Sequence, residues 1–259
     1  MTRSATPNGG ELNKIMVVCN IREIELNKTC NYIHLISGGL DSAYSLLKTA
    51  KKNSKKEPTA AIHPIFFDYG HFAAETEWAC IAKIIDYVRN LVGSQSIIDV
   101  PLRISLKSEL FQWSESDAFR GIEGKREPEI ENRNLVLFSV LASYLMACAK
   151  HQNVPDAKFH VTSGFKDTEM KDSSDKFFKK FAKLLFMYQP EMKFRFPVLK
   201  NWSRLRILEE TKKLLDPNER LARDKLMKFQ KLTTSCYSPA NEGEPCGRCS
   251  KCKFLETKK

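Results

Sequence analysis

Short apolar runs alternate with longer amphipathic stretches through the first two-thirds of the chain. Four runs have the length and composition of buried strands: Tyr32 to Ile36, Ala61 to Phe67, Ile97 to Val100 and Phe159 to Thr162. Between them, three segments have the pattern of helices: Leu40 to Lys52, Ala74 to Val92 and Asn134 to Lys150. This alternation predicts βαβ units, and therefore an α/β fold with a parallel β-sheet and helices on both faces.

The pattern changes after Pro197. Two further helices are predicted, at about Ser203 to Leu215 and Asn218 to Gln230, and a segment rich in Cys, Gly, Pro and Glu follows them. We therefore predict an N-terminal extension (1–30), a main domain (31–200) and a C-terminal helical appendage (201–259). Ile15 to Asn20 is a candidate for one extra strand in the extension.

Composition is that of a globular protein. In the 259 residues, 42% are hydrophobic and 28% are charged, which argues against wholesale disorder and against a fibrous repeat. The first fourteen residues lack the apolar stretch of a secretory signal, and no apolar run reaches membrane-spanning length. We expect a cytoplasmic protein, in which cysteines stay reduced and a cysteine cluster indicates metal binding or catalysis.

The formal net charge of +11 favours anionic partners such as nucleotides, nucleic acid or acidic proteins. Many lysines, however, lie along predicted helices. One predicted helix has a group of lysines on one side and a stripe of apolar residues on the opposite side. The lysines are Lys176, Lys179, Lys180 and Lys183, and the stripe consists of Phe177, Phe178, Phe181, Leu184 and Leu185. This spacing is typical of a surface helix with a buried stripe. We prefer a solvated lysine face to a nucleic-acid footprint, so nucleic acid is not an expected partner.

The most specific motif is the loop that follows the first strand, Ser37-Gly38-Gly39-Leu40-Asp41-Ser42. Glycines at a strand-to-helix junction let the backbone approach an anion, and the helix dipole adds to the attraction. The hydroxyls of Ser37 and Ser42 can donate further hydrogen bonds. The loop matches the S-G-G-x-D-S signature of the PP-loop superfamily, whose members cleave ATP between the α and β phosphates, and it is not a Walker loop.

A plain Gly-Gly turn with Asp41 or Ser42 as a helix cap is the alternative, but it explains only two residues of the motif. We assign catalytic roles to Ser37, Asp41 and Ser42 and expect this loop to be exposed to ligand rather than packed. Magnesium would neutralise charge on the departing pyrophosphate, and Asp41 is the candidate for holding it.

Four cysteines near the C-terminus have a spacing typical of a zinc site: Cys236, Cys246, Cys249 and Cys252. An iron–sulfur cluster and a redox dithiol are the rival assignments, and free core cysteines are the plain one. A site closed by four sulfurs has no vacancy for substrate, so we expect structural Zn²⁺. The other four cysteines, Cys19, Cys30, Cys80 and Cys148, are expected to pack in the core.

Together, the two motifs resemble those of the 7-cyano-7-deazaguanine synthase (QueC-like) family. Intermediate segments agree in order and spacing. Phe67-Asp68-Tyr69-Gly70-His71 with Glu75 is similar to the family's F-D-Y-G-Q…E segment, with histidine for glutamine. Arg133-Asn134 is similar to the end of its P-x-R-N segment, with Glu131 in place of proline. Phe196-Pro197-Val198 with Arg204 is similar to its T-P-L…K segment, with arginine for lysine.

The resemblance implies a PP-loop/HUP-like fold for residues 31–200 and a nucleotide site built by the loop and several other residues. These are Asp68, Tyr69, Gly70, Arg133, Asn134, Gly164 and Asp167. Arg133 and Asp167 would also contact the substrate, as would Asp175. The family's S-G-Y-P-D-C-R acceptor stretch corresponds to Lys171 to Phe177, in which only Asp175 matches.

The implied reaction is an ATP-dependent conversion of 7-carboxy-7-deazaguanine to an amide and then a nitrile, with ammonia as nitrogen donor. One rival keeps the adenylation but joins the deazaguanine to an amine on a protein, as in QueC-like anti-phage defence. Other rivals are a tRNA-modifying PP-loop enzyme and a non-catalytic zinc-bearing nucleotide-binding module. A homodimer is left open by the sequence.

Overall fold

The computed structural model describes residues 24–28, 30–56, 60–71, 73–93, 98–106, 133–165, 172–197 and 202–234. In these residues, five strands form one sheet in the order β3-β2-β1-β4-β5, and every neighbouring pair is parallel. The strands are β1 (Asn31–Leu35), β2 (Ile62–Asp68), β3 (Leu102–Ser105), β4 (Lys158–Thr162) and β5 (Lys193–Arg195).

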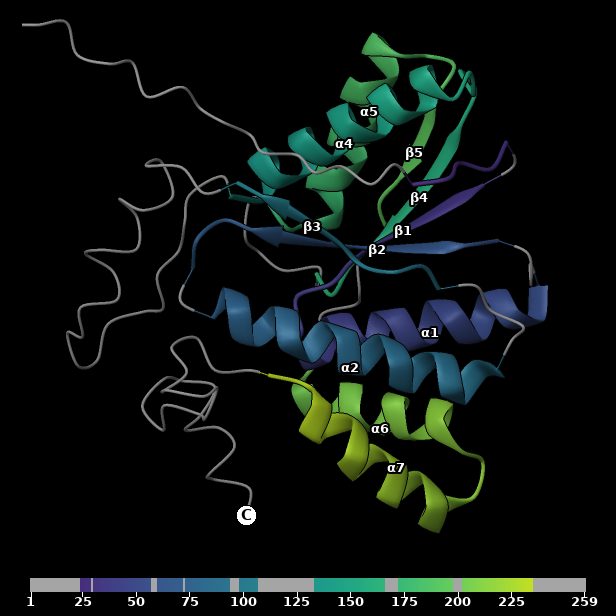
Figure 1. Ribbon diagram of the computed structural model, residues 1–259, viewed down its shortest axis with the longest axis vertical. Coiled ribbons are helices and arrows are strands. Elements are labelled where there is room, and N and C mark those ends of the chain that lie inside the picture. The colour runs from purple at the N-terminus through teal and green to yellow at the C-terminus, as the bar shows by residue number, and fades with distance from the viewer. Residues whose placement is uncertain are drawn as a thin grey trace, which may run out of the picture.

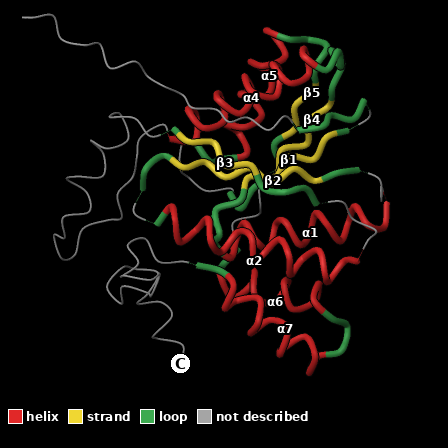
Figure 2. The backbone as a smooth tube through the Cα atoms, in the orientation of Figure 1, coloured by secondary structure: helices red, strands yellow, loops and turns green. Residues whose placement is uncertain are grey.

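Helices cover both faces of the sheet, as the sequence predicted (Figure 1). One face carries α4 (Arg133–His151) and α5 (Asp175–Tyr188), and the other carries α1 (Leu40–Lys56) and α2 (Ala74–Val92). The last two helices, α6 (Arg204–Leu215) and α7 (Glu219–Leu232), pack on the outer side of α1 and α2. Figure 2 shows the strands as one layer between these helices.

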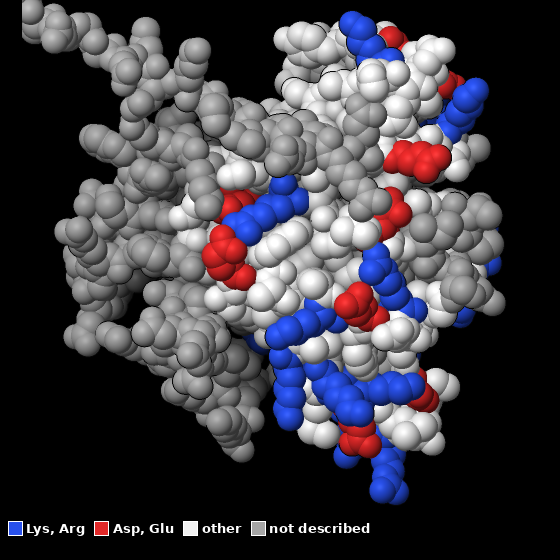
Figure 3. Space-filling view, in the orientation of Figure 1, with Lys and Arg blue, Asp and Glu red and all other residues white. Residues whose placement is uncertain are grey.

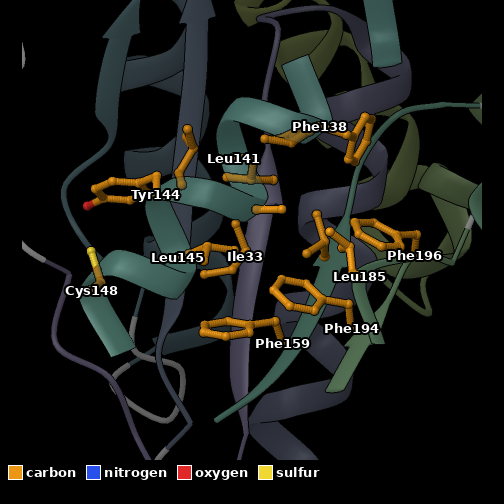
Figure 4. Close-up of a cluster of buried hydrophobic side chains, with 14 of the residues drawn as sticks. Ile33, Phe138, Leu141, Tyr144, Leu145, Cys148, Phe159, Leu185, Phe194 and Phe196 are labelled. Carbon is orange, nitrogen blue, oxygen red and sulfur yellow. The ribbon is translucent and has the colours of Figure 1, made fainter. Parts of the chain in front are cut away.

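Each face of the sheet has its own hydrophobic core. The core under α4 and α5 is aromatic: the centroid of the Phe138 ring lies 4.8 Å from that of Phe178 and 5.4 Å from that of Phe196. Figure 4 shows Phe138 and Phe196 in this core. The core on the other face joins α1 and α2 to residues of the C-terminal helices, including Ile207 and Phe229, which have no exposed surface. The C-terminal helices therefore fold onto the main body by apolar burial.

Three of the four predicted strands are confirmed, with each end within one residue of the predicted bound. The prediction of a strand at Ile97 to Val100 is wrong. Ile98 makes only an isolated bridge to Ile62, and β3 lies further along, at Leu102–Ser105. Sequence reasoning also missed β5, in which only Phe194 is buried. Both are edge strands, and such strands need no continuous apolar run because one side of the ladder is open.

The predicted helices are confirmed, and α2 has the predicted bounds. The lysines of α5 are exposed and Phe178, Phe181 and Leu185 are buried, but the prediction for Leu184 is wrong because 46% of its surface is exposed. Of the cysteines expected in the core, Cys148 is buried, whereas Cys30 and Cys80 are half-buried. Cys19 and the candidate strand at 15–20 lie outside the described residues.

Contrary to the sequence-based expectation, one helix in the described part of the chain, α4, is long and apolar enough to cross a membrane by length and composition. Half of its apolar window is buried inside the protein, against the sheet and α5. We therefore interpret α4 as a core helix. In Figure 3, lysine and arginine side chains gather at the end of the molecule formed by α6 and α7, with acidic side chains among them.

Candidate functional site

The predicted phosphate loop lies at the topological switch point of the sheet. β1 is flanked by β2 on one side and by β4 on the other, so successive connections leave it in opposite directions. In open parallel sheets, ligands bind at the carboxyl ends of the strands at such a point. The loop leaves β1 after Leu35, and α1 begins at Leu40.

Gly38 is required by the shape of this loop. Its φ of +66° is unfavourable for other residues, and a Cβ atom there would lie 2.9 Å from the carbonyl oxygen of Glu77 in α2. Gly39 is less crowded, because a Cβ atom there would make only ordinary contacts at 3.5 Å and 3.6 Å. Gly38 is therefore needed for the conformation of the loop, whereas Gly39 leaves the backbone open to the close approach of a ligand.

Ser42 stabilises the loop through hydrogen bonds made by its side chain. Its Oγ donates to the Gly39 carbonyl oxygen at 2.9 Å and accepts from the Ser37 N–H at 3.2 Å. Only 3% of Ser42 is exposed, so the expectation of a loop free of packing is wrong at this position. Ser37 is exposed, and its Oγ lies 3.3 Å from the Ser42 Oγ.

Asp41 lies in the first turn of α1, and its carboxylate interacts electrostatically with Arg204, the first residue of α6. Burial lowers the pKa of Arg204, and the Asp41 carboxylate partly offsets that effect. The chain just after α7 also reaches the loop, because the Thr234 N–H donates to the Gly38 carbonyl oxygen at 2.9 Å. Residues from the C-terminal appendage thus complete the surroundings of the loop.

Asp68 ends β2, and its carboxylate is held inside the protein. Its Oδ2 accepts from Arg103 Nη2 at 2.6 Å and Nε at 3.2 Å, and its Oδ1 accepts from the Gly70 N–H at 3.0 Å. Arg103 also pairs with Glu75, and these carboxylates together raise the pKa of its guanidinium. Asp68 therefore shapes the turn at Tyr69 and Gly70.

That turn presents Tyr69 to the start of α4. The Tyr69 ring stacks on His71 with centroids 4.2 Å apart, and the Arg133 guanidinium lies 5.9 Å from the Tyr69 ring centroid. His71 Nε2 in turn lies 2.9 Å from a carboxylate oxygen of Glu77. Glu77 thus contacts the turn through its side chain and Gly38 through its backbone.

A second loop approaches from the carboxyl end of β4. A Cβ atom at Gly164 would lie 2.4 Å from the Ser42 nitrogen, so only glycine allows this contact. Further along, an Asp172 oxygen accepts from the Asn134 N–H at 3.0 Å, at the first turn of α4. The strand ends of β1, β2 and β4 and the start of α4 therefore converge.

A comparison with known protein families shows which family the chain belongs to. Residues 31–257 match the family model described as "Queuosine biosynthesis protein QueC". The chain belongs to the QueC family. No curated protein sequence matches the chain. At the level of the QueC family, the match supports an ATP-dependent synthase role in queuosine biosynthesis that acts on small molecules.

The QueC match includes every predicted site residue, but the structure describes only some of them. Asp175 is the first residue of α5 and pairs with Lys179 at 2.5 Å on the helix surface. Asp167 and the four cysteines lie outside the described residues, so their assignments stay predictions. Within the described residues, no group of three or more His, Cys, Asp or Glu is arranged to hold a metal ion.

Several residues of this candidate site were not anticipated from the sequence: His34, Arg103, Asp172 and Thr234. Arg103 and Asp172 support the Asp68 turn and the head of α4, respectively. His34 lies inside β1, between the loop and β4. A single ionisable residue within an apolar strand that leads into the loop was the available signal.

Proposed function

We propose that the protein uses ATP to adenylate the carboxylate of 7-carboxy-7-deazaguanine, after which ammonia yields the amide and a second adenylation yields the nitrile. The observation that carries this proposal is the complete S-G-G-L-D-S loop at the carboxyl end of β1, within a family match that spans residues 31–257. The glycine backbone and the first turn of α1 suit a bound pyrophosphate group.

The described residues divide into two proposed groups. Ser37, Gly39 and the amides at the start of α1 would hold the β and γ phosphates, and Asp41 would hold Mg²⁺, which neutralises the leaving pyrophosphate. Arg204, whose charge is coupled to Asp41, would keep that carboxylate oriented. On the acceptor side, Tyr69 and Arg133 would contact the deazaguanine acid, because a planar ring and a guanidinium suit a base and a carboxylate.

Each proposed step balances without another reactant. A carboxylate oxygen attacks the α phosphorus, and pyrophosphate leaves. Ammonia then attacks the carbonyl carbon, AMP leaves with that oxygen, and one proton is lost to give the amide. In the second round, the amide oxygen attacks the α phosphorus of another ATP and pyrophosphate leaves. Loss of AMP with that oxygen, and of both protons of the amide nitrogen, then forms the nitrile.

Mass spectrometry of the products tests this proposal directly. Protein would be incubated with 7-carboxy-7-deazaguanine labelled with ¹⁸O in its carboxylate, ATP and Mg²⁺, with and without ammonium. We expect ¹⁸O in the AMP and, only with ammonium, amide and nitrile. AMP without ¹⁸O would rule out carboxylate adenylation, and absence of acid-dependent AMP would rule out this substrate.

A second candidate is transfer of the adenylated deazaguanine to an amine on a protein, with the reaction stopping at the amide. The observation that favours it is the segment before α5, where Asp172 accepts from the Asn134 N–H and Ser174 caps α5 in place of the family's Tyr-Pro-Asp-Cys. This predicts slow nitrile formation, amide accumulation and added mass on a co-expressed partner. Complete and rapid nitrile formation without a protein adduct would exclude it.

We also propose that Cys236, Cys246, Cys249 and Cys252 bind a structural Zn²⁺ ion. The donor set of four thiols suits zinc, and the segment begins two positions after Thr234, which is hydrogen-bonded to Gly38. Zinc would therefore stabilise the segment that follows Thr234. A non-catalytic nucleotide-binding module would share these features but would give no acid-dependent exchange of pyrophosphate into ATP.

A further inference from the structure

His34 is an unusual residue for its place in the fold. It lies in β1, all five residues of which are buried, and none of its surface is exposed. Central strands of parallel sheets are normally near-continuous apolar runs because both faces are covered. A buried imidazole needs hydrogen-bond partners to offset the loss of water.

Two partners from different elements meet the two ring nitrogens. Nε2 lies 3.0 Å from the Ser42 carbonyl oxygen, and Nδ1 lies 2.7 Å from Thr162 Oγ1. A carbonyl oxygen can only accept, so this network assigns the proton to Nε2 and leaves Nδ1 to accept from the Thr162 hydroxyl. The ring therefore bridges the first turn of α1 and the last residue of β4.

Burial keeps the His34 ring neutral. Burial lowers the pKa of His34 from 6.5 to about 4, and the hydrogen bond to Ser42 offsets this only in part. One tautomer is therefore held across the physiological pH range. Protonation would reverse the hydrogen bond to Thr162, because Nδ1 would then donate to the hydroxyl oxygen, and it would place an uncompensated charge inside the protein.

Ser42 is the point where the contacts of the loop meet. Its hydroxyl is bonded to Gly39 and Ser37, its carbonyl oxygen to His34, and its backbone nitrogen lies against Gly164. Thr162 and Gly164 begin the connection that leads from β4 towards α5. His34 thus fixes the spacing between the phosphate loop and the β4–α5 connection.

We propose that His34 is a positioning residue that holds the phosphate loop in register with the β4–α5 connection, and so aligns the α phosphorus with the acceptor carboxylate. This inference rests on the proposed function, because alignment matters only if an acceptor is adenylated. Misplacement of reacting groups by about 1 Å is enough to slow a reaction by roughly a hundredfold.

The first test examines the bridge independently of activity. Histidine labelled with ¹⁵N in the full-length protein gives signals that report tautomer and protonation, and the His34 signal is assigned by its loss in His34→Gln. We expect a neutral ring with the proton on Nε2, unchanged between about pH 8 and pH 5.5. A His34 signal that titrates near the ordinary histidine value, or that shows the other tautomer, would overturn the bridge.

The second test uses exchange of labelled pyrophosphate into ATP, dependent on 7-carboxy-7-deazaguanine. His34→Leu removes both hydrogen bonds and should lower kcat about tenfold or more, whereas His34→Gln, which can donate and accept, should stay within about threefold of wild type. Thr162→Val added to His34→Leu should cause little further loss, because both variants break one bridge.

The matched control is His63→Leu in β2, which also removes a buried histidine but has Asp99 as its neighbour. If His34→Leu and His63→Leu lower the thermal midpoint equally and both keep exchange activity, His34 is only a core residue and the proposal fails. If wild-type protein shows no exchange, the proposed function fails. The ring-tautomer measurement and the affinity of the His34 variants for Mg²⁺–ATP then decide the role of His34 at the loop.

Discussion

Gly164 and Ser42 touch backbone to backbone, with room for no side chain between them. A Cβ atom at Gly164 would lie 2.4 Å from the Ser42 nitrogen and 2.8 Å from its Cα atom. Neither neighbour is a flexible side chain that could move aside. The connection after β4 and the first turn of α1 must therefore shift together if Gly164 is replaced.

Gly164→Ala should lower the free energy of unfolding by about 2 kcal/mol, as forced overpacking usually does. Urea unfolding measures this loss. Gly39→Ala is the control, because neither glycine has a positive φ and a Cβ atom at Gly39 would make only ordinary contacts. An equal loss of stability in the two variants would show that a general cost of replacing glycine, not the contact with Ser42, explains the effect at Gly164.

Gly39→Ala should lower activity strongly but stability only slightly. A methyl group there makes ordinary contacts, so the free energy of unfolding should change by no more than about 1 kcal/mol. The methyl group would occupy the open side of the loop, and pyrophosphate exchange should fall about a hundredfold. Gly38→Ala, which meets the Glu77 backbone, should lose both stability and exchange. Normal exchange by Gly39→Ala would place the phosphates elsewhere.

Asp41→Asn should abolish AMP formation with little change in stability, because the amide keeps the shape but loses the charge proposed to hold Mg²⁺. Ser42→Ala should lose stability as well as activity, since the buried hydroxyl bonds to Gly39 and Ser37. Thermal unfolding and AMP assays on the same preparations separate the two cases. Near-normal AMP production by Asp41→Asn would contradict the role of Asp41.

Stability should depend on pH through His34. Its pKa is lowered from 6.5 to about 4 in the folded protein, so the unfolded chain takes up a proton first as the pH falls. The contribution of the neutral His34 ring to the free energy of unfolding is constant above about pH 6.5. It should decline by about 3 kcal/mol in total between pH 6.5 and pH 4. Urea unfolding across this range should show a smaller decline for His34→Gln. Equal declines would mean that His34 is not held neutral.

The zinc proposal predicts a joint loss of metal and structure. Cys246→Ser should lower bound zinc and the thermal midpoint together, because metal binding by four thiolates contributes folding free energy. Elemental analysis of the purified protein measures the metal directly. Iron in place of zinc, or no metal in the wild-type protein, would overturn the assignment.

The sequence predicted the central elements of the fold because their signals are local. β1, the loop and α1 follow one another within about 26 residues, and each has a short-range signature: an apolar run, paired glycines and helical periodicity. The helix α2 was predicted with its observed bounds for the same reason. The edge strands β3 and β5 lack such a signature, since only Ile104 and Phe194, respectively, are buried in them.

By itself, the sequence determined which family the chain resembles and predicted which loop would hold the phosphates, because motif residues are adjacent or regularly spaced. Tertiary structure alone decided how that loop is held. His34 meets Thr162 across 128 positions, and Arg103 meets Asp68 across 35. Neither pair has a pattern in the sequence, because hydrogen bonds between strands depend on sheet order and register. Ser42 became a buried brace for the same reason: packing of β4 and α1 decided which of its atoms remain accessible.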